Sequence, residues 1–208
     1  MLRNSEDAAG ESEDAQTTSR RLSQAISEGD GISVIAAVDG PDAAREAEEA
    51  GAEAVLVQGG HESSLAAVRV ATDLPILFVF HGEDPDSLEG ADACIVDVRD
   101  DDREWLDRVR LELGDRFEIA PRICRDEHLE FVLEELDPEV VVLGSDGEEP
   151  LAGALELLPD VPAGKLAIAD VGARTREEVV ELERAGVDAV IVAAGNIAHL
   201  VGAAPPEV

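Results

Sequence analysis

Three charged side chains follow or end apolar runs of this sequence and are its candidate catalytic residues. Asp39 and Asp170 each come directly after an apolar run, and Arg122 lies near the end of another. A carboxylate partly shielded from water can act as a general acid or base, and a guanidinium can bind a phosphate or carboxylate through two hydrogen bonds. Proton transfer by Asp39 and Asp170 is therefore one hypothesis. For Arg122, pairing with a nearby carboxylate is the alternative to binding an anionic ligand.

A second group of residues is suited to binding phosphate. Arg174 lies four residues after Asp170, just beyond the same apolar run. Gly195 and Asn196 follow the last apolar run. Main-chain amides of such a turn, together with a guanidinium, can hold a phosphate group. An ordinary tight loop is the alternative for Gly195 and Asn196. A phosphorylated small molecule is the ligand that this group predicts.

Cysteine and histidine do not recur at the spacing of a metal site. Cys94 and Cys124 are the only cysteines, and each lies within or beside an apolar run. This placement is typical of buried or half-buried thiols. We expect neither a metal ion nor a cofactor.

The segment 165–195 shows which elements position these candidates. Apolar runs at 165–171 and 187–194 flank a helical pattern, which a capping box of Thr175 and Glu178 begins and Gly186 ends. A strand, a helix and a second strand joined in this way form one βαβ unit with parallel strands. The segment AGAEAVLV at 50–57 recurs as AGVDAVIV at 185–192, which indicates an architecture of repeated units.

Eight apolar runs alternate with helical patterns after residue 31. The predicted strands are 32–38, 54–58, 76–80, 93–98, 117–123, 140–143, 166–170 and 189–193. Strands this apolar are covered on both faces, as parallel strands are. Eight such units predict an α/β fold, a (β/α)8 TIM barrel that binds ligands at the carboxyl ends of its strands. An open doubly wound sheet is the alternative, but AVDGPD after the first strand is not a glycine-rich phosphate turn.

Two further segments precede the first strand. Residues 1–18 are rich in Glu, Asp, Ser and Ala, and we expect them to form a disordered acidic tail before a single barrel domain at 19–208. Residues 19–28 carry Leu22, Ala25 and Ile26 at helical spacing. This spacing predicts a short extra helix that packs across the domain outside the strand order.

Acidic residues dominate the composition, with 48 Asp and Glu against 16 Lys and Arg and a net charge of −32. This charge repels nucleic acids and anionic membrane surfaces, so we expect neither as a partner. No apolar run reaches the ~20 residues of a membrane span, and no signal peptide is visible, which favours a cytoplasmic protein. Lys165 is the only lysine. Such a composition favours a halophilic protein over an acidic mesophilic one, and it leaves the oligomeric state open.

Several segments resemble the indole-3-glycerol phosphate synthase family, tryptophan-biosynthesis barrels that close an indole ring with loss of carbon dioxide. RLSQAISEGDGISVIAAV, from Arg21, is similar to the leading helix and first strand of that family, and LPILFVF to its third strand. DVGARTREEVVELERAGVDAVIVAAG, from Asp170, resembles its seventh and eighth units. The resemblance covers most of the chain after Arg21. It implies a TIM barrel, a carboxy-lyase activity and a phosphorylated anthranilate or indole ligand.

The positions where this family carries its catalytic residues hold different ones in this chain. They are Ala37, Asp39, Phe78, Val79, Arg122, Leu143 or Gly144, Asp170 and Val171. The synthase reaction needs a lysine ammonium to protonate a carbonyl oxygen and expel water, and Lys165 is the only lysine available. It opens the seventh strand, so the length of that strand, about 16 Å, separates it from the mouth of the barrel. The resemblance therefore implies a family-like barrel with weak or lost synthase activity.

Two other hypotheses fit the same residues. The first is a phosphosugar isomerase or epimerase in which Asp39 and Asp170 serve as acid and base across the mouth. The second is a non-catalytic binding or partner protein that keeps the barrel for its stability. The first predicts proton exchange on a bound phosphosugar, and the second predicts no turnover of any substrate.

We predict that folding depends on salt. At molar potassium chloride the Debye length falls to about 3 Å, so repulsion among the surface carboxylates is screened and the melting temperature should rise. Circular dichroism melts from low to molar potassium chloride measure this dependence. A melting temperature that does not change with salt would show that the acidic surface is not an adaptation to high ionic strength.

Overall fold

The computed structural model describes residues 20–98 and 103–200. Eight parallel strands form a closed barrel in the order of the sequence, as predicted. They are β1 Ser33–Val38, β2 Ala54–Val57, β3 Ile76–Phe80, β4 Ala93–Asp97, β5 Glu118–Ile123, β6 Val140–Leu143, β7 Leu166–Ala169 and β8 Ala189–Ala193. The ring closes where Ser33 to Ala37 of β1 pair with Ala189 to Ala193 of β8. The predicted acidic tail at 1–18 lies outside the described residues.

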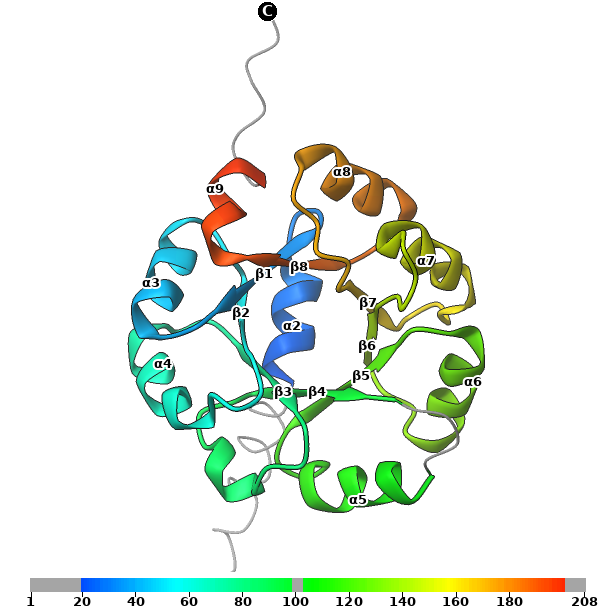
Figure 1. The fold of residues 1–208 in the computed structure, drawn as a ribbon, viewed down its shortest axis with the longest axis horizontal. Coiled ribbons are helices and arrows are strands. Elements are labelled where there is room, and N and C mark those ends of the chain that lie inside the picture. Colours follow the sequence, from blue (N-terminus) through cyan, green and yellow to red (C-terminus); the bar gives the residue numbers. More distant parts are fainter. Residues whose placement is uncertain (1–19, 99–102, 201–208) are drawn as a thin grey trace, which may run out of the picture.

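Helices surround the ring of strands (Figure 1). The α-helices are α3 Pro41–Glu49, α4 Leu65–Ala71, α5 Arg103–Leu113, α6 Asp126–Glu135, α7 Pro150–Leu157, α8 Arg176–Ala185 and α9 Ile197–Leu200. Short 3-10 helices are η1 Glu62–Ser64, η2 Pro85–Leu88, η3 Leu158–Asp160 and η4 Ala194–Asn196. Among the described residues, no helix is long and apolar enough to cross a membrane.

Helix α8 begins and ends at the residues that the sequence indicates. The Thr175 hydroxyl accepts from the main-chain N–H of Glu178, and the Glu178 carboxylate accepts from the N–H of Thr175. Gly186 follows the helix with φ 99°, a left-handed conformation that glycine adopts at little cost. Main-chain hydrogen bonds from Arg174 and Thr175 lower the pKa of Glu178. The loop after β7 is therefore fixed to the first turn of α8.

Alternate residues of each strand belong to two different cores. One core fills the barrel and includes Ile35, Leu56, Leu77, Ile95 and Ile168. The residues between them, such as Val34, Val55 and Phe78, pack between the sheet and the helices. Because both faces of nearly every strand are buried, the strands are apolar throughout.

The predicted extra helix, α2 Arg21–Glu28, closes the amino-terminal end of the barrel. Leu22 and Ile26 belong to the interior core together with Leu166, the first residue of β7. The main-chain N–H of Ser23 donates to Glu118, the first residue of β5 (3.2 Å). In the view of Figure 1, α2 lies across the centre of the ring. The helix therefore plugs the barrel instead of lying against its outer wall.

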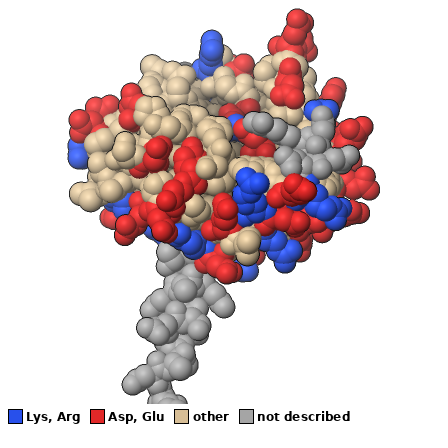
Figure 2. Space-filling model, turned by 60° about the horizontal axis from the view of Figure 1, so that its bottom comes forward, with Lys and Arg blue, Asp and Glu red and all other residues tan. Residues whose placement is uncertain are grey.

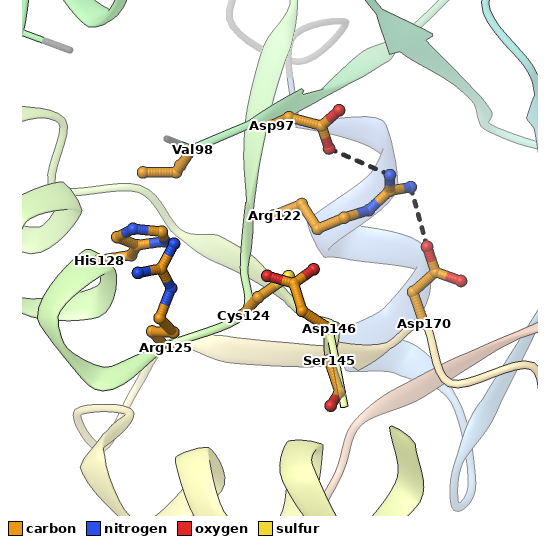
Figure 3. Close-up of a pocket in the computed structure, with 10 residues that line it drawn as sticks. Asp97, Val98, Arg122, Cys124, Arg125, His128, Ser145, Asp146 and Asp170 are labelled. Atoms are coloured by element: carbon orange, nitrogen blue, oxygen red, sulfur yellow. Dashed lines mark hydrogen bonds and ion pairs between the residues drawn. The ribbon is translucent and has the colours of Figure 1, made fainter. Parts of the chain in front are cut away.

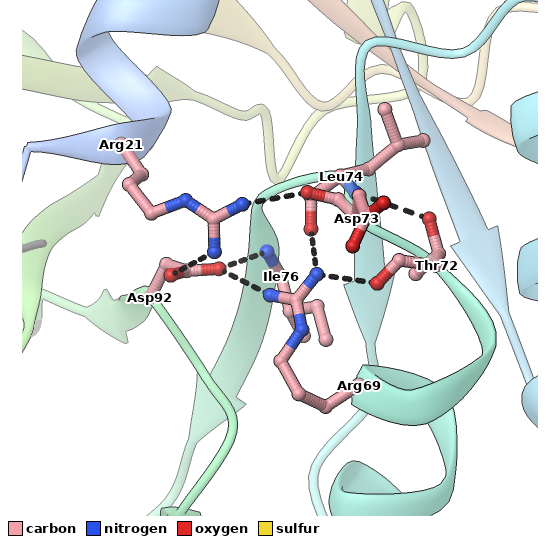
Figure 4. Close-up of polar contacts among 7 residues, drawn as sticks. All are labelled: Arg21, Arg69, Thr72, Asp73, Leu74, Ile76 and Asp92. Carbon is pink, nitrogen blue, oxygen red and sulfur yellow. Dashed lines mark hydrogen bonds and ion pairs between the residues drawn. The ribbon is translucent and has the colours of Figure 1, made fainter.

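A buried carboxylate joins α2 to the barrel. Asp92, directly before β4, accepts from Arg21 of α2 (3.0 Å), from Arg69 of α4 (2.9 Å) and from the main-chain N–H of Ile76 in β3 (2.8 Å). Both guanidinium groups also donate to main-chain carbonyls of the loop between α4 and β3 (Figure 4). One carboxylate thus ties the plug helix, an outer helix and two strands together.

The charge of the surface is visible from the side shown in Figure 2, where Asp and Glu cover much of the face and Lys and Arg lie among them. In the described part of the chain, eight basic residues form ion pairs with carboxylates: Arg20, Arg21, Arg45, Arg69, Arg103, Arg116, Arg122 and Lys165. Arg110, Arg174 and Arg184 form no such ion pair among the described residues.

We predict that Asp92→Ala lowers the free energy of unfolding by about 2–4 kcal/mol, because it leaves two guanidinium groups and a buried N–H without their acceptor. The matched control is Asp42→Ala, which removes the exposed ion pair between Asp42 and Arg45 and should cost about 0–1 kcal/mol. Urea unfolding in molar potassium chloride measures both. Equal losses in the two variants would contradict the role given to Asp92.

Candidate functional site

A polar pocket of about 610 Å³ opens at the carboxyl ends of strands β4 to β7. Its lining includes acidic, basic and thiol side chains: Asp97, Val98, Arg122, Cys124, Arg125, His128, Gly144, Ser145, Asp146 and Asp170. Figure 3 shows Arg122 reaching between Asp97 and Asp170, with Arg125 and His128 at the start of helix α6 to one side. The pocket lies at the end of the barrel where the sequence predicts ligand binding.

Arg122 lies between two carboxylates in this pocket. Its guanidinium contacts Asp97 at the end of β4 (3.1 Å) and Asp170 after β7 (2.8 Å). All three side chains are partly exposed, at 33%, 21% and 28% for Asp97, Arg122 and Asp170. Each follows an interior residue by two positions, Ile95, Ala120 and Ile168, so each belongs to the top interior layer of the barrel. We call Asp97, Arg122 and Asp170 the mouth triad.

Arg122 is engaged by protein carboxylates, which was the alternative to its binding an anionic ligand. Two carboxylates and one guanidinium give the triad a formal charge of −1, so it disfavours a phosphate at this point. Asp97 Oδ2 and Asp170 Oδ1 have no hydrogen-bond donor among the described residues and can accept from a ligand. The triad therefore positions two carboxylates for hydrogen-bond donors or for proton transfer.

Cys124 lies beside the triad but is not a thiolate at neutral pH. Burial, followed by the charge and hydrogen bond of the nearby Asp146 carboxylate, raises the pKa of Cys124 to about 11. Cys94, the other cysteine, lies inside the barrel wall, where burial raises its pKa to about 12. A protonated thiol is a poor nucleophile, so covalent catalysis by either cysteine is disfavoured.

The remaining predicted site residues lie outside this pocket. Asp39 is exposed directly after β1 and is not part of the lining that contains Asp170. The pocket that Asp170 lines therefore does not include Asp39.

The three predicted phosphate-binding residues follow β7 and β8. Arg174 is exposed, and its main-chain N–H donates to Glu178 (2.8 Å). Its guanidinium forms no ion pair among the described residues, although its charge helps to lower the pKa of Glu178. Gly195 and Asn196 lie in η4, just after β8. Because β7 and β8 are paired neighbours, these loops occupy adjacent positions on the rim.

Asp97 is the main residue of the site that sequence reasoning did not single out. It ends ACIVD as Asp170 ends LAIAD, with an apolar residue two positions before each aspartate. That common spacing is a signal that both carboxylates lie on the same side of the sheet. Arg125 and His128 were missed because they belong to the start of α6, where their approach to the pocket depends on the packing of that helix.

Comparisons with known proteins give one distant relative and a common fold. No protein-family model matches the chain. An indole-3-glycerol phosphate synthase of Haloarcula marismortui is 27% identical over 177 residues, which cover 77% of this chain and 65% of the relative. The chain thus spans less than two thirds of the length of that relative. At this identity the match shows distant similarity to the synthase.

Solved structures with the same fold include three enzymes of lower identity. Thiamine phosphate pyrophosphorylase from Pyrococcus furiosus has a TM-score of 0.63 and 14% identity, over 82% of this chain and 93% of that one. A mutant tryptophan synthase alpha subunit from P. furiosus has a TM-score of 0.63 and 16% identity, over 82% and 98%. Tryptophan synthase from M. tuberculosis has a TM-score of 0.64 and 14% identity, over 87% of this chain and 91% of that one. These likenesses show the barrel fold alone.

We predict that Cys124 reacts slowly with iodoacetamide. A pKa of about 11 in place of 9.0 leaves about a hundredfold less thiolate at pH 8. Asp146→Asn should increase the alkylation rate by lowering this pKa, whereas Asp137→Asn, at the other end of the barrel, should not. Mass spectrometry of the Cys124 peptide between pH 7 and pH 10 measures both rates. Fast alkylation of the unmodified protein at pH 7 would contradict the raised pKa.

Proposed function

We propose that this chain is a barrel of the tryptophan-pathway type that binds a phosphorylated anthranilate or indole metabolite at its mouth and has weak or no synthase activity. The observation that carries the proposal is the mouth triad, because an ion-paired arginine and two aspartates occupy the pocket and no lysine lines it. The distant similarity to an indole-3-glycerol phosphate synthase supports the ligand class. The loss of activity follows from the chemistry of the side chains.

The position of Lys165 supports the loss of synthase activity. It directly precedes β7, and its ammonium donates to the carboxylate and the main-chain carbonyl of Asp137. The four residues of β7 span about 13 Å, so this ammonium cannot reach a carbonyl oxygen at the mouth. The mouth therefore has no lysine ammonium that could protonate the oxygen that leaves as water during ring closure.

The phosphate of the proposed ligand would bind away from the triad. Arg174 offers an exposed guanidinium that forms no ion pair among the described residues, and Gly195 and Asn196 offer main-chain amides on the neighbouring loop. The negative triad would then face the sugar and amine portion, where hydroxyl and N–H groups donate to Asp97 and Asp170. In this arrangement the rim binds the anion and the pocket binds the hydrogen-bond donors.

A second candidate function is a phosphosugar isomerase or epimerase. Asp97 and Asp170 contact the same guanidinium, and each retains one oxygen without a donor among the described residues. Two carboxylates held in this way can exchange protons with adjacent carbons of a bound sugar phosphate. In this version Asp97 takes the place that the sequence analysis gave to Asp39.

We predict no conversion of carboxyphenylamino-deoxyribulose phosphate to indoleglycerol phosphate above a blank. Each missing proton-transfer group typically costs ~10²–10⁴ in rate, and several are absent together. Fluorescence-monitored indole formation in molar potassium chloride tests this, beside Asp170→Ala. Turnover that Asp170→Ala abolishes would mean that Asp170 has taken over the role of the acid and that the site is not degenerate.

Binding of the same phosphate ester is the second measurement. Isothermal titration should show binding that Arg174→Gln weakens about tenfold, the loss typical of one charge-assisted hydrogen bond. The matched control, Arg184→Gln, changes another exposed arginine without a carboxylate partner among the described residues. Incorporation of deuterium from the buffer into carbon positions of a bound sugar phosphate would favour the isomerase. If neither binding nor exchange is seen, the hypothesis of a non-catalytic partner protein would remain.

A further inference from the structure

A second pocket, of about 510 Å³, lies at the amino-terminal end of the barrel, opposite the mouth. Its lining includes Glu118, which begins β5, Glu139, which precedes β6, and Lys165, which precedes β7. Arg20, directly before the plug helix α2, also contributes. Neither the family resemblance nor the mouth triad gives this pocket a role.

Basic side chains are concentrated in this pocket. Arg20, Arg110 and Lys165 line it, although the whole chain has only 16 basic residues. Arg20 pairs with Glu139 (3.1 Å), and Lys165 pairs with Asp137. Arg110, near the end of α5, has no carboxylate or other partner among the described residues. In a protein with 48 acidic residues, a guanidinium left without a carboxylate beside a pocket is available to a ligand.

The third acidic side chain of the lining, Glu118, is buried at the start of β5. Its Oε2 accepts from the N–H of Ser23, and its Oε1 has no partner among the described residues. Burial raises the pKa of Glu118, and the nearby Glu139 also raises it, whereas the hydrogen bonds from Ser23 and the charge of Arg20 lower it. The net shift favours the neutral form. The pocket thus combines three basic side chains with two paired carboxylates and one buried carboxyl group.

The residues around Lys165 hold it in a fixed position. Asp137 has φ 45°, the one positive value among the non-glycine residues that the structure describes, and it precedes Pro138. The Lys165 ammonium donates to both the carboxylate and the carbonyl of Asp137. The lysine therefore contributes a charge whose place is already fixed before a ligand arrives.

One wall of the pocket is apolar. Phe117 is buried, and Ile119 and Leu136 are half-buried beside it. A pocket of this size with an apolar wall and a few polar groups is typical of small-molecule sites. The combination excludes a bare inorganic ion as the best ligand, because such an ion would leave the apolar wall in water.

We propose that this amino-terminal pocket binds a small organic carboxylate, whose head group pairs with Arg110 near Lys165 and whose apolar part packs against Phe117, Ile119 and Leu136. The site is independent of the proposed mouth ligand. Its lining joins Arg20, next to α2, to the starts of β5, β6 and β7. Binding would therefore stabilise the docked position of the plug helix.

Benzoate is the probe, because it has the expected head group and a flat apolar body. Isothermal titration at constant potassium chloride should show saturable binding of benzoate, and at least tenfold weaker binding of acetate, which lacks the body, and of benzamide, which lacks the charge. Inorganic phosphate should bind no better than acetate. Benzamide binding equal to benzoate, or no binding of benzoate, would overturn the proposal.

Three arginine variants locate the site. Arg110→Gln should weaken benzoate binding about tenfold, whereas the exposed Arg184→Gln, outside the pocket, should leave it unchanged. Arg174→Gln, on the opposite rim, should also leave it unchanged, which separates this site from the proposed phosphate site. Circular dichroism melts with and without benzoate then test the link to α2, and the stabilisation should disappear in Arg110→Gln. Equal weakening by Arg110→Gln and Arg184→Gln would overturn the proposal.

Discussion

Closure of eight parallel strands into a ring constrains the rest of this protein. In a closed barrel every strand buries one face in the interior and the other beneath the helices, so polar side chains are tolerated only where a strand begins or ends. The interior core follows this rule, with Ile35, Leu77 and Ile168 in its middle and charged residues at its two ends. The barrel thereby creates two polar ends separated by an apolar centre.

The two ends use charge differently. At the carboxyl end, Arg122 is shared by Asp97 and Asp170, and the resulting group is negative and partly open to solvent. At the amino-terminal end, Asp92 is buried beneath two arginines and serves the packing of α2. Similar ion pairs are therefore open to a ligand where solvent reaches them and hold packed elements together where it does not.

The shortage of basic residues makes each one that is present informative. Most of the arginines and the single lysine in the described part of the chain lie against carboxylates. Arg174 at the rim and Arg110 at the opposite end are exceptions among the described residues, and each lies where a ligand can approach. Lys165, the only lysine of the sequence, is held at the amino-terminal end, away from the mouth. A shared barrel fold therefore does not by itself decide which chemistry the mouth can perform.

The sequence alone determined the fold, the strand order and the plug helix as an element. Apolar runs of strand length, helical spacing between them and the capping box of Thr175 with Glu178 are local signals, and they hold without knowledge of distant contacts. The sequence also indicated Arg122 and Asp170 as residues near strand ends. It gave no contact between them, because 47 residues separate positions 122 and 170. Their pairing depends on the parallel register of β5, β6 and β7.

Only the tertiary structure decided which charged residues share a cavity. In strands that are apolar on both faces, the alternation of side chains leaves no trace in hydropathy, so hydropathy did not show which face of the sheet Asp97 and Asp170 share. Asp39 and Asp170 both follow apolar runs in the sequence, yet Asp39 is exposed and Asp170 lines the pocket. The placement of α2 across the amino-terminal end of the ring also depended on the closed barrel. The amphipathic pattern of a short helix shows that one face is covered, but it does not show which element covers it. Direction and partner are properties of the packed molecule, because they arise from strand register and closure and not from the local chain.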